Sequence, residues 1–124
     1  MTHNTMITII DDDEAVRVAT ENLVRSLGFA TSTFASAEEF LRSPRAGNTA
    51  CVITDVQMPG MTGIELQNVL RAKGDRTPLI FITAFPEDRV RQQAVAAGAV
   101  GFLAKPFEGD AMIACIDRAL VAGA

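Results

Sequence analysis

The chain of 124 residues contains little histidine and little cysteine. Its one histidine, His3, lies in the N-terminal tail, where a catalytic role is not expected. The two cysteines, Cys51 and Cys115, lie in apolar stretches, and they form neither a CxxC pair nor the spacing of metal ligands. Both are therefore expected to be buried, unreactive thiols.

Long apolar runs, a surplus of positive charge and common nucleotide-binding motifs are also lacking. No apolar run approaches the roughly 18–20 residues of a membrane span, and Met1 to Asn4 are too few and too polar for a signal peptide. The net charge of −4 gives no general attraction to nucleic acid or to an anionic membrane. Neither a P-loop nor GxGxxG is present. We therefore expect a cytoplasmic protein that, by this chain alone, binds neither nucleic acid nor membrane.

Short apolar strands alternate with helical segments five times along the chain. The predicted strands are Met6–Ile10, Ala30–Phe34, Cys51–Asp55, Pro78–Thr83 and Val100–Ala104. The predicted helices are Glu14–Leu27, Ser36–Leu41, a helix that begins at Thr62, Pro86–Gly98 and Gly109–Val121. Capping boxes at Ser36–Glu39 and Thr62–Glu65 open the second and the third of them. Strands buried on both faces and separated by helices predict an α/β fold, in which helices cover both faces of a parallel sheet.

The same chain is expected to form a single domain. Its 48% hydrophobic and 21% charged residues are typical of a globular protein. The segment Ser43–Thr49, with Pro44 and Gly47, is expected to be a loop, but no linker or low-complexity segment divides residues 1–124.

Polar residues stand where four of the predicted strands end. Asp11 and Asp12 follow the first strand, Asp55 ends the third, Thr83 ends the fourth and Lys105 follows the fifth. In an open α/β sheet the functional crevice lies beyond the carboxyl ends of the strands. If these four strands are neighbours at that crevice, the five residues converge on one pocket.

Each of these residues also has an ordinary structural explanation when it is taken alone. An aspartate after a strand usually caps the next helix, and Asp13 is the expected cap here. A lone threonine at a strand end is usually structural, and a lone Lys-Pro pair is usually a surface turn. The cap leaves Asp11 and Asp12 unexplained, however, and the coincidence of all these residues at strand ends argues for a site.

The chemistry of such a site follows from its charges. Three carboxylates a few ångströms apart repel one another, and a hard cation such as Mg²⁺ resolves that repulsion. An ionised aspartate can attack phosphorus and form an aspartyl-phosphate. The charge that develops on the phosphoryl oxygens needs fixed positive charge, from the metal and Lys105, and a hydroxyl donor, from Thr83.

Four segments of the chain resemble the receiver domains of two-component response regulators. They are Ile9–Asp12, Thr54–Gly63, Ile82–Ala84 and Ala97–Phe107. Each segment alone is moderately specific, but the four occur in the family's order and spacing and cover essentially the whole chain. The sequences of these segments are most similar to those of the receivers of FixJ-type regulators.

The resemblance implies a fold and a metal site. The fold is a flavodoxin-like (βα)5 three-layer sandwich, whose parallel five-stranded sheet has the order 2-1-3-4-5. Asp55 is then the phosphoacceptor and, with Asp12 and the carbonyl of Gln57, a direct ligand of Mg²⁺ or Mn²⁺. Asp11 is expected to act on the metal mainly through water.

The resemblance also implies how the domain signals. Thr83 and Lys105 would bind the phosphoryl oxygens, Phe102 would be the aromatic switch residue, and the peptide between Lys105 and Pro106 would be cis. A sensor histidine kinase or a phosphotransfer protein would supply the phosphoryl group, so the chain is expected to be a signalling domain and not an enzyme. Its switching surface, also a possible homodimer interface, comprises the last two predicted helices and the strand between them.

Three features depart from the family's usual pattern. Gln57, two residues after Asp55, is not a common choice in receivers, and many receivers carry a polar side chain at the position of Phe85, two residues after Thr83. Both replacements can change the lifetime of the phosphoryl group. Phe85 either leans over the pocket as a shield or packs against Pro86 and the following helix. FixJ-type regulators usually carry a DNA-binding domain after the receiver, whereas this sequence ends at Ala124; it is either a stand-alone receiver or an excised one.

Two rival functions fit the sequence less well. A metal-dependent phosphatase with an aspartyl nucleophile would favour two aspartates two positions apart after the first strand, whereas the candidate nucleophile here follows the third. A pseudo-receiver, which binds partners without phosphotransfer, would be missing a member of the acidic, threonine and lysine set, and none is missing here.

Overall fold

A computed structural model describes residues 5–44 and 48–122 of the chain. His3, the tail Met1–Asn4, Gly47 and the chain end at Ala124 lie outside the described residues. The strands are β1 Met6–Ile10, β2 Ala30–Phe34, β3 Cys51–Asp55, β4 Leu79–Thr83 and β5 Gly101–Ala104. The helices are α1 Glu14–Ser26, α2 Ala37–Arg42, α3 Gly63–Ala72, α4 Asp88–Ala96 and α5 Gly109–Ala122.

The strands form one parallel sheet in the order β2-β1-β3-β4-β5, which confirms the predicted flavodoxin-like topology. Their register sets the carboxyl ends level with one another. Ile10 of β1 lies beside Thr54 of β3, Asp55 lies beside Ile82 of β4, and Thr83 lies beside Ala104 of β5. Residues that end or directly follow these strands are therefore brought to one edge of the sheet.

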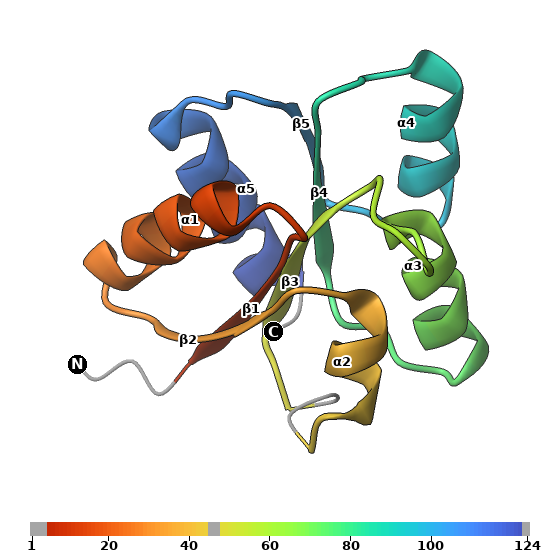
Figure 1. The fold of residues 1–124 in the computed structure, drawn as a ribbon, viewed down its shortest axis with the longest axis horizontal. Helices are drawn as coiled ribbons and strands as arrows, with labels where there is room; N and C mark the ends of the chain where they lie inside the picture. The colour runs from red at the N-terminus through yellow and green to blue at the C-terminus, as the bar shows by residue number, and fades with distance from the viewer. Residues whose placement is uncertain (1–4, 45–47, 123–124) are drawn as a thin grey trace.

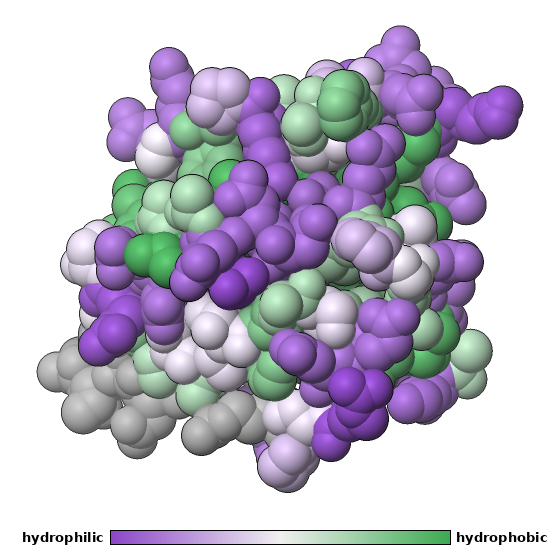
Figure 2. Space-filling model, in the orientation of Figure 1, coloured by the Kyte–Doolittle hydropathy of each residue, from purple (hydrophilic) through white to green (hydrophobic). Residues whose placement is uncertain are grey.

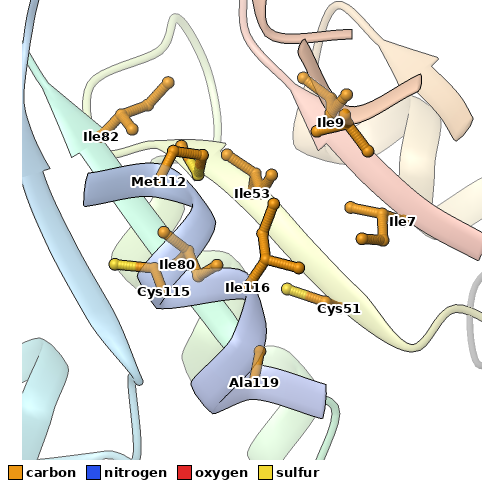
Figure 3. Packing of buried hydrophobic residues seen from close by; sticks show 11 residues of the cluster. Ile7, Ile9, Cys51, Ile53, Ile80, Ile82, Met112, Cys115, Ile116 and Ala119 are labelled. Carbon is orange, nitrogen blue, oxygen red and sulfur yellow. The ribbon is translucent and has the colours of Figure 1, made fainter. Parts of the chain in front are cut away.

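Helices cover both faces of the sheet (Figure 1): α1 and α5 lie on one face, and α2, α3 and α4 lie on the other. Alternation along the strands divides the core between these faces. In β1, for example, Ile9 packs in the α1–α5 layer and Ile10 packs in the opposite layer. Figure 3 shows α5 lying across the sheet, with Met112 and Ile116 among isoleucines of β1, β3 and β4.

Both cysteines lie in this apolar core, as the sequence predicted. Burial, with a smaller contribution from the nearby Cys115, raises the pKa of the Cys51 thiol to about 12. Burial also raises the pKa of Cys115. Neither thiol is a thiolate at neutral pH, which accounts for their expected lack of reactivity.

Three of the predicted helix starts are confirmed, one of them with an incomplete capping box, and the start of α4 needs correction. Asp13 caps α1, and Thr62 and Glu65 form the complete capping box of α3. At α2, Ser36 accepts the N–H of Glu39, but the Glu39 carboxylate accepts from Ala35 instead of Ser36, so that box is only half formed. Pro86 precedes α4 and does not lie in its first turn, because the extended Glu87 is the N-cap residue.

None of the helices in the described part of the chain is long and apolar enough to cross a membrane. Hydrophilic surface gathers in the centre of Figure 2, in front of the place where β1 and β3 end in Figure 1. The strand-terminal residues named above belong to this edge of the sheet.

Candidate functional site

Three carboxylates meet where β1 and β3 end. Asp11, Asp12 and Asp55 each offer one carboxylate oxygen, and these oxygens all lie within 4.8 Å of one another. Asp11 is fully buried and Asp55 is almost so, whereas Asp12 is exposed. The cluster is therefore built on two fixed acids and remains open to solvent through the third.

Lys105 brings a positive charge into this cluster from the end of β5. Its Nζ lies 2.8 Å from Oδ2 of Asp55 and 3.1 Å from Oδ2 of Asp11, and its side chain is 14% exposed. The expected convergence is thus present for Asp11, Asp12, Asp55 and Lys105. One ammonium bridges acids from two different strands.

Backbone amides hold the other oxygen of each buried acid. The N–H of Asp13 donates to Oδ1 of Asp11 at 2.9 Å, and the N–H of Gln57 donates to Oδ1 of Asp55 at 3.1 Å. Oδ2 of Asp11 receives no hydrogen bond from the described residues, although the Lys105 ammonium lies close to it. The acids are fixed in orientation, but their charge is only partly compensated.

The pKa shifts follow from this imbalance. Burial raises the pKa of Asp11 above the ordinary aspartate value, against the opposing effects of the Asp13 amide and Lys105. Burial acts to lower the pKa of Lys105, but its pairing with Asp55 and Asp11 outweighs burial and raises that pKa. Lys105 therefore stays charged at neutral pH, and the cluster keeps an excess of negative charge.

These observations fit a divalent cation. Carboxylate oxygens are the ligands that Mg²⁺ and Mn²⁺ prefer, and the cluster combines surplus negative charge with an accessible carboxylate on Asp12. The buried Oδ2 of Asp11, which lacks a hydrogen bond in the described structure, is a further acceptor at the same place.

Thr83 ends β4 at the same edge of the sheet, with its side chain buried. Its hydroxyl oxygen accepts the N–H of Phe85 at 3.0 Å, and its carbonyl oxygen accepts the N–H of Lys105 at 2.8 Å. The described contacts thus link Thr83 to Lys105 through the backbone. Phe85 is 66% exposed, which disfavours close packing against α4.

The other residues implied by the resemblance lie close by in the fold. Gln57 directs its backbone N–H to Asp55, while its own side chain is exposed. Phe102 of β5 is half-buried, and its ring centroid lies 6.3 Å from that of Phe81 in β4. The peptide between Lys105 and Pro106 is cis, as the resemblance implied.

Sequence reasoning missed two residues that support this site. Arg17 of α1 donates from Nη1 to the carbonyl oxygen of Asp11 at 2.7 Å. Gly63 brings the start of α3 so close to β3 that a Cβ at this position would collide with the carbonyl oxygen of Asp55. Gly63 lies in one of the recognised segments, so its signal was visible in the sequence, but its function was not.

A comparison with known families settles the family. The family model described as "Response regulator receiver domain" matches residues 7–117. The chain belongs to the response regulator receiver family. Receiver domains form a signalling family within two-component systems and bind Mg²⁺ through an acidic pocket, and the described structure of this receiver holds a cluster of three aspartates, Asp11, Asp12 and Asp55.

Several regulators and solved structures are similar to this receiver. It is 39% identical to response regulator protein TodT of Pseudomonas putida over 115 residues, covering 93% of this chain and 51% of TodT. It is 38% identical to transcriptional regulatory protein FixJ of Bradyrhizobium diazoefficiens over 120 residues, covering 97% of this chain and 58% of FixJ. The chain thus spans about half the length of the curated relatives that it matches.

Two solved structures agree with the fold in detail. The response regulator StyR superimposes with a TM-score of 0.89 at 40% identity, covering 97% of this chain and 61% of StyR. The structure described as FixJ-N superimposes with a TM-score of 0.84 at 34% identity, covering 97% of this chain and 96% of FixJ-N.

The charge balance predicts the effect of removing the ammonium. Replacement of Lys105 by methionine should lower the free energy of unfolding by about 2 kcal/mol at pH 7 without metal, less than the roughly 3–5 kcal/mol typical of a fully buried pair. Urea unfolding followed by far-UV circular dichroism measures this loss. Lys73→Met, which changes an exposed lysine after α3, is the matched control.

The same loss should shrink in two situations. Asp11→Asn removes one of the facing charges, so the double variant should regain part of the stability. Lowering the pH should act likewise, because the raised pKa of Asp11 lets this carboxyl take up a proton sooner than an ordinary aspartate. Equal losses with and without Asp11→Asn would contradict the bridging role of Lys105.

Proposed function

We propose that this receiver domain accepts a phosphoryl group on Asp55, from a sensor histidine kinase or a phosphotransfer protein, with Mg²⁺ or Mn²⁺ bound. The observation that carries the proposal is the Lys105 ammonium, which lies 2.8 Å from an Asp55 oxygen inside the three-carboxylate cluster. The Asp55 carboxylate, the carboxylates of Asp11 and Asp12, and the Lys105 ammonium lie together, which supports their roles as nucleophile, metal-binding set and fixed positive charge. Phosphoryl transfer needs these groups together.

Asp12, Asp55 and the carbonyl oxygen of Gln57 would hold the cation directly, and Asp11 would act mainly through water. When bound, the cation would neutralise charge on the acids and on the phosphoryl oxygens. The exposure of Asp12 supports this assignment, because the ion can enter from solvent on that side.

The chain's own residues would carry out the transfer. An Asp55 oxygen attacks phosphorus, the bond from phosphorus to the donor nitrogen breaks, and the histidine of the partner leaves with the electron pair. Lys105 would then pair with the phosphoryl oxygens. Because the Thr83 oxygen already accepts a bond from Phe85, its hydroxyl proton can be donated to a phosphoryl oxygen.

Phosphorylation would switch the surface formed by α4, β5 and α5. Thr83 would move toward the phosphoryl group, and Phe102 would rotate inward to fill the space that it leaves. The half-buried position of Phe102 on β5, two residues before Ala104, supports this coupling. The switched surface would control a partner or an output domain, and it could also form a homodimer.

Residues 1–124 would act as one receiver domain in the cytoplasm and would bind neither nucleic acid nor membrane by themselves. Relatives such as FixJ are named transcriptional regulatory proteins. Control of transcription is therefore the output that we propose for any longer regulator that contains this receiver.

Phosphorylation with a small-molecule donor tests the proposal directly. Incubation with acetyl phosphate and Mg²⁺ should increase the intact mass by about 80 Da, and Asp55→Asn should abolish the increase because the nucleophile is lost. Asp12→Ala should abolish the metal-dependent increase and leave the far-UV circular dichroism spectrum unchanged. Asp110→Asn, which changes an exposed acid in α5, is the control.

Two outcomes would contradict the assignment of the phosphoacceptor and of the metal ligands. A persistent mass increase in Asp55→Asn would show that another residue is the phosphoacceptor. Undiminished metal affinity in Asp12→Ala would show that the proposed ligand set is wrong.

We propose that Phe85 shields the phosphoryl group, and this predicts a long-lived phosphorylated state. Phenylalanine cannot hydrogen-bond the water that attacks the aspartyl-phosphate, and its ring can shield the phosphoryl group. Phe85→Glu should speed hydrolysis several-fold, equivalent to about 1 kcal/mol in the barrier. Loss of the added mass over time measures the rate, with Gln57→Ala as a second variant because the Gln57 amide can also orient water. Equal rates for wild type and Phe85→Glu would exclude the shield.

A further inference from the structure

The loop Val56–Thr62 joins β3 to α3 and carries Gln57, whose carbonyl oxygen is a proposed metal ligand. Its two ends are held by backbone hydrogen bonds. The N–H of Val56 donates to the carbonyl oxygen of Ile82 at 3.0 Å. The N–H of Gly63 donates to the carbonyl oxygen of Val56 at 2.8 Å. The middle of the loop receives its support from a different element, α2.

Glu38 of α2 provides that support. Its Oε2 accepts the N–H of Met61 at 3.0 Å, across 23 residues of sequence. Gly60 has a φ of +77°, and a Cβ there would lie 2.5 Å from the same carboxylate oxygen. The glycine therefore allows both the turn and the approach of Glu38. The Met61 amide lowers the pKa of Glu38, so the hydrogen bond is made to an ionised carboxylate.

The neighbouring acid has a different part in the structure. Glu39 is exposed and accepts the N–H of Ala35 at 3.1 Å, a contact confined to the start of α2. Both acids lie in the first turn of the same helix, where negative charge is favourable. Glu39 thus shares the charge and the helix position of Glu38 but does not reach the loop, which makes it a matched control.

We propose that Glu38 is a positioning residue for the metal site. Its carboxylate holds the Gly60–Met61 backbone and so fixes the loop that presents the Gln57 carbonyl oxygen. Glu38 does not belong to the Asp11, Asp12 and Asp55 cluster, and it acts on that cluster only through the loop. Groups that orient a metal ligand tune metal affinity in this way. The inference rests on the proposed function, because it requires a metal that uses the Gln57 carbonyl.

Two measurements on the full chain test the proposal. Amide hydrogen exchange by NMR of the metal-free protein reports whether the loop is held, and electron paramagnetic resonance of free Mn²⁺ gives the metal Kd. In Glu38→Ala, Met61 should exchange faster, and the Mn²⁺ Kd should rise on the order of ten-fold. Glu38→Gln should recover part of both, because its amide oxygen can accept the same bond, and Glu39→Ala should change neither.

Different results of these measurements would contradict the positioning role of Glu38 and the proposed function on which it rests. Faster Met61 exchange with an unchanged Mn²⁺ Kd in Glu38→Ala would overturn the positioning role, as would an equal rise of the Kd in Glu39→Ala. A wild-type protein that does not bind Mn²⁺ would overturn the proposed function itself. If Glu38→Ala does not fold, Glu38→Gln decides, since the weaker acceptor must still raise the Kd measurably.

Discussion

The site depends on one electrostatic constraint: acids from β1 and β3 are buried together, and the ammonium of Lys105 lies between them. A buried carboxylate is costly unless it is paired and hydrogen-bonded. The fully buried Asp11 is tolerated because the Asp13 amide and Lys105 face it. Compensation remains incomplete, because one ammonium faces the carboxylate cluster of the described structure. This remaining negative charge makes the pocket suited to a divalent cation.

The fold produces this constraint through the register of the strands and through the close approach of α3 to β3. Level strand ends place Asp55 beside Ile82, next to Thr83, while Gly63 lets α3 start directly against the Asp55 carbonyl. Lys105 is bonded through its backbone to Thr83 and follows β5 directly. Under the proposed function, a change of charge at Asp55 would therefore act on the segments that border α4 and α5. In that proposal, the short chain of contacts from Asp55 through Lys105 and Thr83 would carry the signal to the surface.

Much of this arrangement could be predicted from the sequence. Every strand was located to within one residue, because β-branched runs that end at acidic or turn residues give a strong local signal. The convergence of Asp11, Asp55 and Lys105 followed from their strand-terminal positions once neighbouring strands were assumed. The strand order itself came from the family resemblance and not from periodicity.

The rest depends on tertiary contacts that local patterns do not encode. The hydrogen bond from the Met61 N–H to the Glu38 carboxylate joins residues 23 positions apart. The first turn of α2 marks Glu39 as the capping-box residue, but nothing in it marks Glu38 as a contact of the loop. The contact of Arg17 with the Asp11 carbonyl requires the position of α1 on the sheet. At α4, proline suggested a helix start two residues too early, because proline is equally compatible with the extended segment before an N-cap.

The central claim is that the charge state of Asp55 controls the surface made by α4, β5 and α5. The most direct measurement is amide hydrogen exchange of the Mg²⁺-loaded protein with and without beryllofluoride, a phosphoryl mimic, in wild type and in Asp55→Asn. Exchange in α4, β5 and α5 should change when beryllofluoride is added to the wild type and should stay constant in Asp55→Asn. Changes confined to α1 and α2, or equal changes in both proteins, would contradict it.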